Sequence, residues 1–148
     1  MAASKWQIYN EAKKYLLTAD LDLNSTAVRV KLLAGTKSAA VSNYTRSTFA
    51  SLTHITTNLK TAVKSLPGIL VTAGASAKEI KFDSTAMLFS ASGGTVTSIQ
   101  YAVIGISGGK ALAWSKLSSA VFSLTAGNVL TITPNASGLF TVTGGVTP

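Results

Sequence analysis

The chain has few side chains that could carry out catalysis. It contains one histidine, His54, and no cysteine in 148 residues. A cysteine–histidine catalytic pair is therefore excluded, and a zinc site made of histidine and thiolate ligands is disfavoured. A serine triad would have to use His54, but the sequence contains no G-x-S-x-G turn. We therefore interpret His54 as a surface or core residue.

The acidic side chains are spread along the chain rather than paired for catalysis. They are Glu11, Asp20, Asp22, Glu79 and Asp83. A glycosidase needs two opposed carboxylates, whereas the pair at 20 and 22 flanks a turn beside a basic strand. That pair could offer oxygen ligands to a cation, but its spacing matches no EF-hand loop. We expect no catalytic residue and no metal site.

The glycines and the last two acids also have structural explanations. The Gly-Gly pairs at 93–94 and 108–109 lack the G-x-x-x-x-G-K-[ST] spacing of a phosphate-binding loop. We interpret them as hairpin turns, which need the positive φ that glycine supplies. The carboxylates at 79 and 83 lie among lysines, so we predict local charge pairing there. We expect no cofactor.

The basic residues suggest an electrostatic contact. Thirteen lysines and arginines against five acids give a net charge of +8. Arg29 and Lys31 would share one strand face, and Lys78 and Lys81 lie close in sequence. We predict that these four residues face solvent or an acidic protein surface. Nucleic acid is a less favoured partner, because the aromatic residues lie mostly in apolar runs away from these lysines.

The elements that must position these residues are mainly short strands. After Gly68, apolar or alternating runs are separated by turn residues at regular spacing. This pattern predicts an all-β fold, mainly an antiparallel β-sandwich or jelly roll. The predicted strands are 69–73, 78–83, 86–91, 95–107, 110–117, 120–124, 128–134 and 138–142.

The first part of the chain is less regular. Residues 5–17 have helical spacing, with Ser4 as the N-cap, and predict a short N-terminal helix. Residues 28–32 alternate apolar and basic, which predicts a half-exposed strand. Residues 36–47 read as a loop, and 48–66 fit either a helical turn or a short strand. We expect one domain over 1–148, with the sandwich at about 26–143.

The N-terminus and the composition indicate an intracellular protein. Charges at Lys5, Glu11, Lys13 and Lys14 interrupt any apolar signal-peptide core. No run of 18 apolar residues is present, so we expect no membrane span. The absence of cysteine fits a cytosolic folding compartment. We therefore expect a soluble product made inside the cell.

The second part of the chain is almost uncharged. Residues 84–148 contain only Lys110 and Lys116 as charged residues, although ordinary soluble surfaces are about a quarter charged or more. Within it, 99–106 is apolar on both strand faces, so we expect a second sheet, the N-terminal helix or a neighbouring copy to cover the second face. Subunit interfaces are poor in charge and rich in apolar and aromatic groups. Our interface candidates are Trp6, Tyr9, Ile104, Ile106 and Trp114.

Several stretches resemble a known group of proteins. QYAVIGISGGKALAWSKLS (100–118), FSLTAGNVLTITPNASGLFTV (122–142) and the start of the chain, KWQIYNEAKKYLL (5–17) and DLNSTAVRVKLLAG (22–35), are similar to small virion structural proteins of tailed bacteriophages. Capsid decoration (cement) proteins are the most similar of these. The resemblance implies a non-enzymatic subunit, made in the host bacterial cytoplasm, that stabilises the capsid as repeated copies. Its implied partners are the major capsid protein or another virion protein, with self-association as a dimer or trimer.

Other functions remain open at this point. The chain could be a tail or head–tail junction component, which ring or tube stoichiometry would reveal. It could also be a receptor- or glycan-binding head fibre module, in which Trp6, Tyr44 or Trp114 would be exposed. A nucleic-acid-binding protein is the last alternative, and its DNA affinity would depend steeply on salt.

Overall fold

The computed structural model describes residues 5–17, 23, 27–42 and 48–143, and these fold mainly into antiparallel β-sheets. The expected all-β class with a short N-terminal helix is confirmed, whereas the finer assignment to a two-sheet sandwich stays a prediction. The elements in chain order are β1 (Gln7–Ile8), α1 (Asn10–Leu17), β2 (Val28–Ala34), a 3-10 turn (Gly35–Lys37), α2 (Ser38–Val41), β3 (Val63–Ser65), β4 (Leu70–Ala73), β5 (Glu79–Asp83), β6 (Met87–Ser90), β7 (Val96–Ile106), β8 (Ala111–Lys116), β9 (Phe122–Leu124), β10 (Val129–Ile132) and β11 (Phe140–Thr143). Each of the eight strands expected after Gly68 is present, so that prediction is also confirmed.

The largest sheet is built around β7. Its strands lie in the order β1-β8-β7-β2-β3, and β9 pairs with the first part of β7. All of these pairings are antiparallel. β7 is therefore hydrogen-bonded on both of its edges, with β2 on one side and β8 and β9 on the other.

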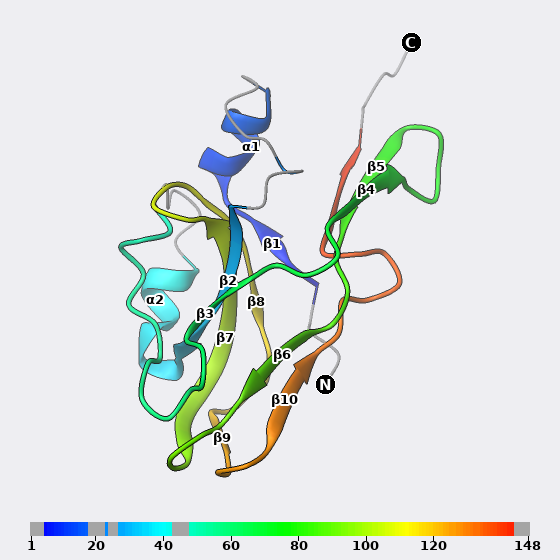
Figure 1. Ribbon diagram of the computed structural model, residues 1–148. Coiled ribbons are helices and arrows are strands. Elements are labelled where there is room, and N and C mark those ends of the chain that lie inside the picture. Colours follow the sequence, from blue (N-terminus) through cyan, green and yellow to red (C-terminus); the bar gives the residue numbers. More distant parts are fainter. Residues whose placement is uncertain (1–4, 18–22, 24–26, 43–47, 144–148) are drawn as a thin grey trace.

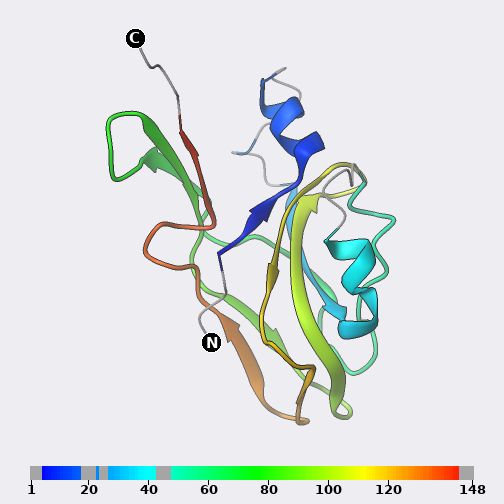
Figure 2. The same ribbon diagram turned by 180° about the vertical axis from the view of Figure 1, so that it is seen from behind.

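Other parts of the same chain lie against both faces of this sheet. Figures 1 and 2 show α2 on one side of β7 and β8, and the β6–β10 pair on the opposite side. On the α2 side, Phe49 lies against Gly105, and the Tyr9 hydroxyl donates to the Val41 carbonyl oxygen at 2.9 Å. On the β6 side, Val30 lines a small pocket together with Met87. The sheet is thus an inner layer between two covering layers.

This arrangement explains why 99–106 is apolar on both faces. Every residue from Ile99 to Gly105 is buried, and their apolar side chains belong to one core cluster with residues of the other sheets. A strand covered on both faces no longer alternates apolar with polar residues. The described residues of one chain bury this strand, so a neighbouring copy is not needed to cover it.

The turn between β7 and β8 is the hairpin that the Gly-Gly pair predicted. The Ile106 N–H donates to the Lys110 carbonyl oxygen at 2.8 Å, and the Gly109 N–H donates to the Ile106 carbonyl oxygen at 3.0 Å. Gly108 has a φ of 69°, in the region that glycine adopts without strain. This Gly-Gly pair therefore closes a hairpin.

The N-terminal helix is shorter than predicted. It begins at Asn10, and residues 5–9 are extended rather than helical. Gln7 and Ile8 pair with β8, and the Tyr9 N–H donates to the Leu112 carbonyl oxygen at 3.0 Å. These bonds satisfy an otherwise open edge of β8, which outweighs the helical preference of a few residues. The proposed cap, Ser4, lies outside the described residues.

Two other predictions for the first part of the chain need correction. β2 is not half-exposed, because it lies between β7 and β3 and its residues from Val30 to Leu33 are buried. Part of the expected loop at 36–47 is helical, as the 3-10 turn and α2, while 43–47 lie outside the described residues. In the ambiguous stretch 48–66, β3 is a strand, and no helix occurs among the residues described there.

A smaller sheet projects from one side of the molecule. It has the strand order β11-β5-β4 and lies beside the large sheet in Figures 1 and 2. The β4–β5 hairpin forms its outer part. Among the described residues, no helix is long and apolar enough to cross a lipid bilayer.

Candidate functional site

The three-stranded sheet has one apolar face and one polar face. Its cross-strand rows are Val142–Ile80–Ala73 and Phe140–Phe82–Val71. Side chains two residues apart on a strand lie on the same face, so these two rows form one continuous apolar face. The row between them, Thr141–Lys81–Thr72, lies on the opposite face.

The apolar face is covered at one end only. Phe82 and Phe140 are buried, with their ring centroids 4.9 Å apart. On the rest of this face, Val71 beside Phe82, and Ile80 and Val142 in the next row, are 46%, 56% and 45% exposed. We call the exposed part the outer apolar face, and it consists of Val71, Ala73, Ile80 and Val142. Since β-branched residues on a strand normally pack against a second layer, this surface is suited to contact another protein.

Exposed apolar residues are concentrated on the smaller sheets. Besides the outer apolar face, Leu70 lies on β4, and Leu88 and Val129 lie on the outward face of β6 and β10. Val121, just before β9, is the remaining large apolar residue that is strongly exposed among those described. Single exposed apolar residues are common on protein surfaces, whereas a group of them marks an interaction site.

The polar face of the small sheet carries paired charges. Lys81 Nζ lies 3.2 Å from Asp83 Oδ2, so the predicted local charge pairing is confirmed for this pair. Glu79 Oε2 accepts a hydrogen bond from the Ala75 N–H at 3.1 Å. These carboxylates therefore contact lysine and backbone groups of the β4–β5 hairpin, and the described residues that line the cavity beside Glu79 include no second carboxylate.

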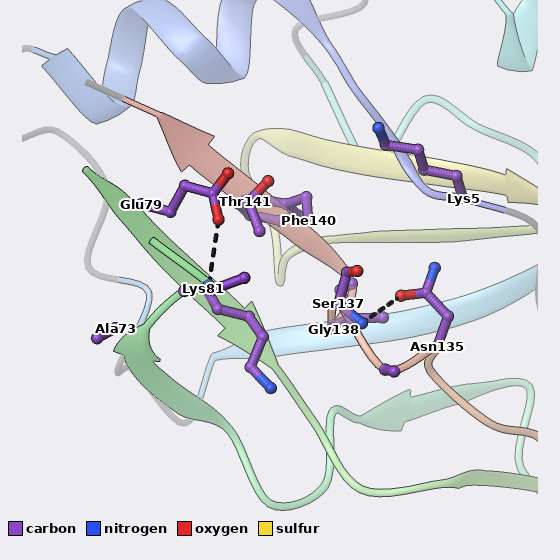
Figure 3. Close-up of a pocket in the computed structure, with 13 residues that line it drawn as sticks. Lys5, Ala73, Glu79, Lys81, Asn135, Ser137, Gly138, Phe140 and Thr141 are labelled. Atoms are coloured by element: carbon purple, nitrogen blue, oxygen red, sulfur yellow. Dashed lines mark hydrogen bonds between the residues drawn. The ribbon is translucent and has the colours of Figure 1, made fainter. Parts of the chain in front are cut away.

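A pocket of about 580 Å³ lies between the polar side of β5 and β11, the loop before β11 and the N-terminal segment. Figure 3 shows Lys5 on one side of it, with Asn135 and Ser137 on the loop. The amino groups of Lys5 and Lys81 point in different directions and do not converge. Asn135 Oδ1 is occupied by the Ser137 N–H at 2.8 Å. The walls of the pocket are thus partly polar and partly apolar, and the described residues that line it include no nucleophile–base pair.

Among the described residues, Lys31 and His54 are the titratable groups whose pKa values the fold shifts. Lys31 is 2% exposed, and its Nζ donates to the Phe49 carbonyl oxygen at 2.6 Å and lies 4.1 Å from the centroid of the Phe49 ring. Burial lowers the pKa of Lys31 from 10.5 to about 8. Burial, and then the charge of Lys31, lower the pKa of His54. These contacts attach the 48–55 segment to the sheet, which is a structural role.

Three of the five interface candidates are core residues of the chain. Trp6, Tyr9 and Ile104 are buried among the chain's own side chains, so we correct their assignment to a subunit interface. Aromatic and branched side chains drive burial within a fold as strongly as between subunits. Ile106 and Trp114 are half-buried and pack against the same core.

The four electrostatic candidates do not form one contact face. Lys31 is buried and cannot meet an external surface, which corrects that prediction. The half-buried Arg29 donates from Nη1 to the Val28 carbonyl oxygen at 3.3 Å. Lys81 is half-buried in its ion pair, whereas Lys78, in the β4–β5 turn, is exposed. Of the four, Lys78 is the best placed to act on a partner.

The remaining chemical candidates are not brought together. Asp20, Asp22 and Tyr44 lie outside the described residues. Among the described residues, no three histidine, aspartate or glutamate side chains form a group that could hold a metal ion. The 580 Å³ pocket is lined by one aromatic residue, Phe140, which is buried, so the flat aromatic surface on which a sugar ring stacks is missing from its walls.

Comparison with protein-family models, with curated proteins and with solved structures gave no match for this chain. A functional assignment must therefore rest on its own residues and geometry. The feature that sequence reasoning missed is the outer apolar face. The alternation in EIKFD (79–83) was its signal, because Glu79, Lys81 and Asp83 occupy one strand face and the apolar residues between them the other.

Proposed function

We propose that this chain is a non-enzymatic structural subunit of a tailed-bacteriophage virion, and that it acts as a capsid decoration protein. It is made in the host bacterial cytoplasm and becomes part of the virion. Repeated copies bind the head lattice and stabilise it, with the major capsid protein or another virion protein as partner. The sequence resemblance to small virion proteins and the all-β fold support this proposal.

The observation that carries the proposal is the outer apolar face. The large sheet is covered on both faces by the chain itself, so the fold already has a core. The small sheet nevertheless leaves Val71, Ile80 and Val142 about half-exposed on one face. A surface that is apolar, uncharged and built on strands fits a second protein surface better than it fits a small polar substrate.

The described functional groups support a binding role rather than catalysis. The perturbed groups Lys31 and His54 are tied to the packing of the 48–55 segment, and the carboxylates of β5 are tied to the β4–β5 hairpin. A catalytic site would require a nucleophile, a base and a stabilising donor within reach of one reacting atom. The pocket of Figure 3 offers no such set.

The test is attachment to heads that lack this protein. Wild-type chain is mixed with purified bare heads, and bound copies are counted after sedimentation and by cryo-electron microscopy. Ile80→Lys places a charge on the outer apolar face, where binding would desolvate it, and should reduce the bound copies at least tenfold. Thr97→Lys, an exposed position at the start of β7, is the matched control and should bind as the wild type does.

Each outcome of this test points to one function. Binding over the whole head surface, lost in Ile80→Lys alone, supports the decoration role. Binding confined to a ring or tube would instead assign the chain to the tail or the head–tail junction. Binding to a host glycan but not to heads would support the receptor-binding alternative. Salt-sensitive DNA binding by the free protein would support the nucleic-acid alternative. Binding of Ile80→Lys equal to wild type would overturn the outer apolar face as the contact.

A further inference from the structure

The β4 strand is an open edge of the small sheet. β4 pairs with β5 on one side, and within the described residues no strand pairs with its other side. Edge strands are usually protected by charged residues, proline or a bulge, because their free backbone groups can pair with another chain. Residues 70–73, LVTA, contain none of these devices, and the whole stretch 65–77 is uncharged.

The register shows which backbone groups of β4 point outward. The Gly74 N–H donates to the Glu79 carbonyl oxygen at 2.8 Å, so Gly74 and Glu79 form a hydrogen-bonded pair. Such pairs alternate with non-hydrogen-bonded pairs along an antiparallel ladder. The pairs Val71–Phe82 and Ala73–Ile80 are therefore of the second kind. The N–H and C=O groups of Val71 and Ala73 point away from β5, toward the free edge.

We propose that β4 pairs in antiparallel fashion with β4 of a second copy of this chain. The two-fold axis passes between Thr72 and Thr72 of the partner subunit. Val71 then lies opposite the partner's Ala73, and Ala73 lies opposite the partner's Val71. This register joins the outward groups of both strands in four backbone hydrogen bonds, and it gives one sheet with the order β11-β5-β4-β4-β5-β11.

The side chains favour a second copy over an unrelated strand. Val71 and Ala73 both belong to the outer apolar face, so the pairing joins the outer apolar faces of the two copies into one surface. Thr72 meets its own equivalent, a favourable cross-strand pair. On the polar face, which carries Thr72, the nearest equivalent charges are Lys81 and the partner's Lys81. They are three strand spacings apart, about 14 Å. That separation exceeds the screening length of about 8 Å at physiological salt.

The inference deepens the proposed function, since it names the contact between copies, but it can fail separately. Four backbone bonds make a small interface, so the pairing should depend on concentration. On a head surface, where copies are held close together, the effective concentration is high. The paired sheet would present an outer apolar face of twice the area to the partner.

The experiment measures mass and cross-linking of the free protein. Sedimentation equilibrium up to millimolar concentration should show the mass of the wild type rising from 15.2 kDa toward twice that value. Val71→Pro removes an outward N–H without removing a bond to β5, a change that edge strands tolerate, and should stay monomeric. Val71→Thr keeps the N–H and the branched side chain and should still associate. Circular dichroism checks that each variant is folded.

Cysteine cross-linking tests the register, because the chain has no cysteine of its own. Residues opposite each other in a non-hydrogen-bonded pair have Cα atoms about 4.5 Å apart, which a disulfide can span. Thr72→Cys should therefore form dimers readily under mild oxidation, whereas Leu70→Cys, on the same strand and face, should not. Equal cross-linking of the two variants, or a wild type that stays monomeric throughout, overturns the pairing. In that case, a loss of head attachment in Ile80→Lys alone would still support the outer apolar face as the contact with the head.

Discussion

Among the described residues, Lys31 is the one whose acid–base chemistry the fold changes most. A lysine charge is costly to bury unless it has partners. Here the ammonium group donates to the Phe49 carbonyl oxygen and lies against the Phe49 ring. Both contacts favour the charged form, but burial outweighs them and lowers the pKa of Lys31 to about 8. Lys31 therefore joins β2 to the 48–55 segment at some cost in free energy.

This cost predicts a specific pH dependence of stability. Between pH 8 and 10.5 the unfolded chain keeps the Lys31 proton while the folded chain loses it, so the free energy of unfolding rises with pH in this window. The difference of about 2.5 between the two pKa values corresponds to at most about 3–4 kcal/mol in the free energy of unfolding. Below pH 8 both states are protonated, and Lys31 adds no slope.

Denaturant unfolding of the wild type and Lys31→Met at pH 7 to 11 checks this prediction. Other lysines and tyrosines titrate in the same window, so the wild-type free energy minus that of Lys31→Met isolates the contribution of Lys31. We expect this difference to rise between pH 8 and 10.5 and to be flat below pH 8. A difference that is flat over the whole range would show that Lys31 keeps its ordinary pKa in the folded protein.

At the scale of the elements, β7 depends on a gap at Gly105. A Cβ atom at this position would lie 2.5 Å from Phe49 Cδ2 and 2.7 Å from the Lys110 carbonyl oxygen. The glycine therefore admits the Phe49 ring to the surface of the sheet and the turn of the β7–β8 hairpin beside it. Glycine within a strand often marks such a close approach.

Gly105→Ala should therefore destabilise the fold by about 1–3 kcal/mol, the usual cost of overpacking. Thermal unfolding measures the loss. Gly109→Ala in the neighbouring turn is the matched control, since its nearest neighbour would lie 3.6 Å from the new Cβ atom and no backbone strain arises. Equal melting temperatures of the two variants would contradict the close packing of Phe49 on Gly105.

Replacing isoleucine by lysine should reduce the free energy of unfolding strongly on β7 and hardly at all on β5. Ile104 is fully buried, whereas Ile80 is 56% exposed on the outer apolar face. Ile104→Lys would bury an unpaired charge and should cost more than about 4 kcal/mol or prevent folding. Ile80→Lys should change the free energy of unfolding by less than about 0.5 kcal/mol. Urea denaturation compares the two, and a large loss in Ile80→Lys would show that its side chain belongs to the core.

For the whole molecule, charge and apolar surface lie on different sides of the small sheet. The net charge of +8 acts over a distance, while the outer apolar face acts only in contact. Lys78 lies in the β4–β5 turn, next to that face in sequence, and is exposed. Charges at the rim of an interface mainly set the association rate, and buried apolar contacts mainly set the dissociation rate.

Lys78→Glu should therefore slow loading onto bare heads several-fold at low salt and change release little. Stopped-flow light scattering at several salt concentrations gives both rates. Lys116→Glu, an exposed position on β8, makes the same change in net charge away from the outer apolar face and should slow loading less. Equal effects of the two variants would assign the attraction to net charge alone, and no effect of either would remove the electrostatic contribution.

The sequence by itself determined most of the strands. Local alternation and turn glycines depend on neighbours within a few residues, and each strand expected after Gly68 is present. The Ser107–Lys110 turn followed from its Gly-Gly pair, and the pairing of Lys81 with Asp83 followed from charges on one strand. Such features are set by side-chain periodicity and by backbone conformations that few residues adopt.

The tertiary structure alone decided which faces are covered. Alternation shows that a strand has two different faces, but the layer packed on each face comes from segments distant in sequence. For this reason Lys31 was expected at the surface and is buried, since the 48–55 segment covers it. Ile104 was expected at an interface and lies in the core, on the strand β7 that has α2 on one side and β6 and β10 on the other. The outer apolar face is exposed for the same reason, because among the described residues no second layer extends over the outer end of the small sheet.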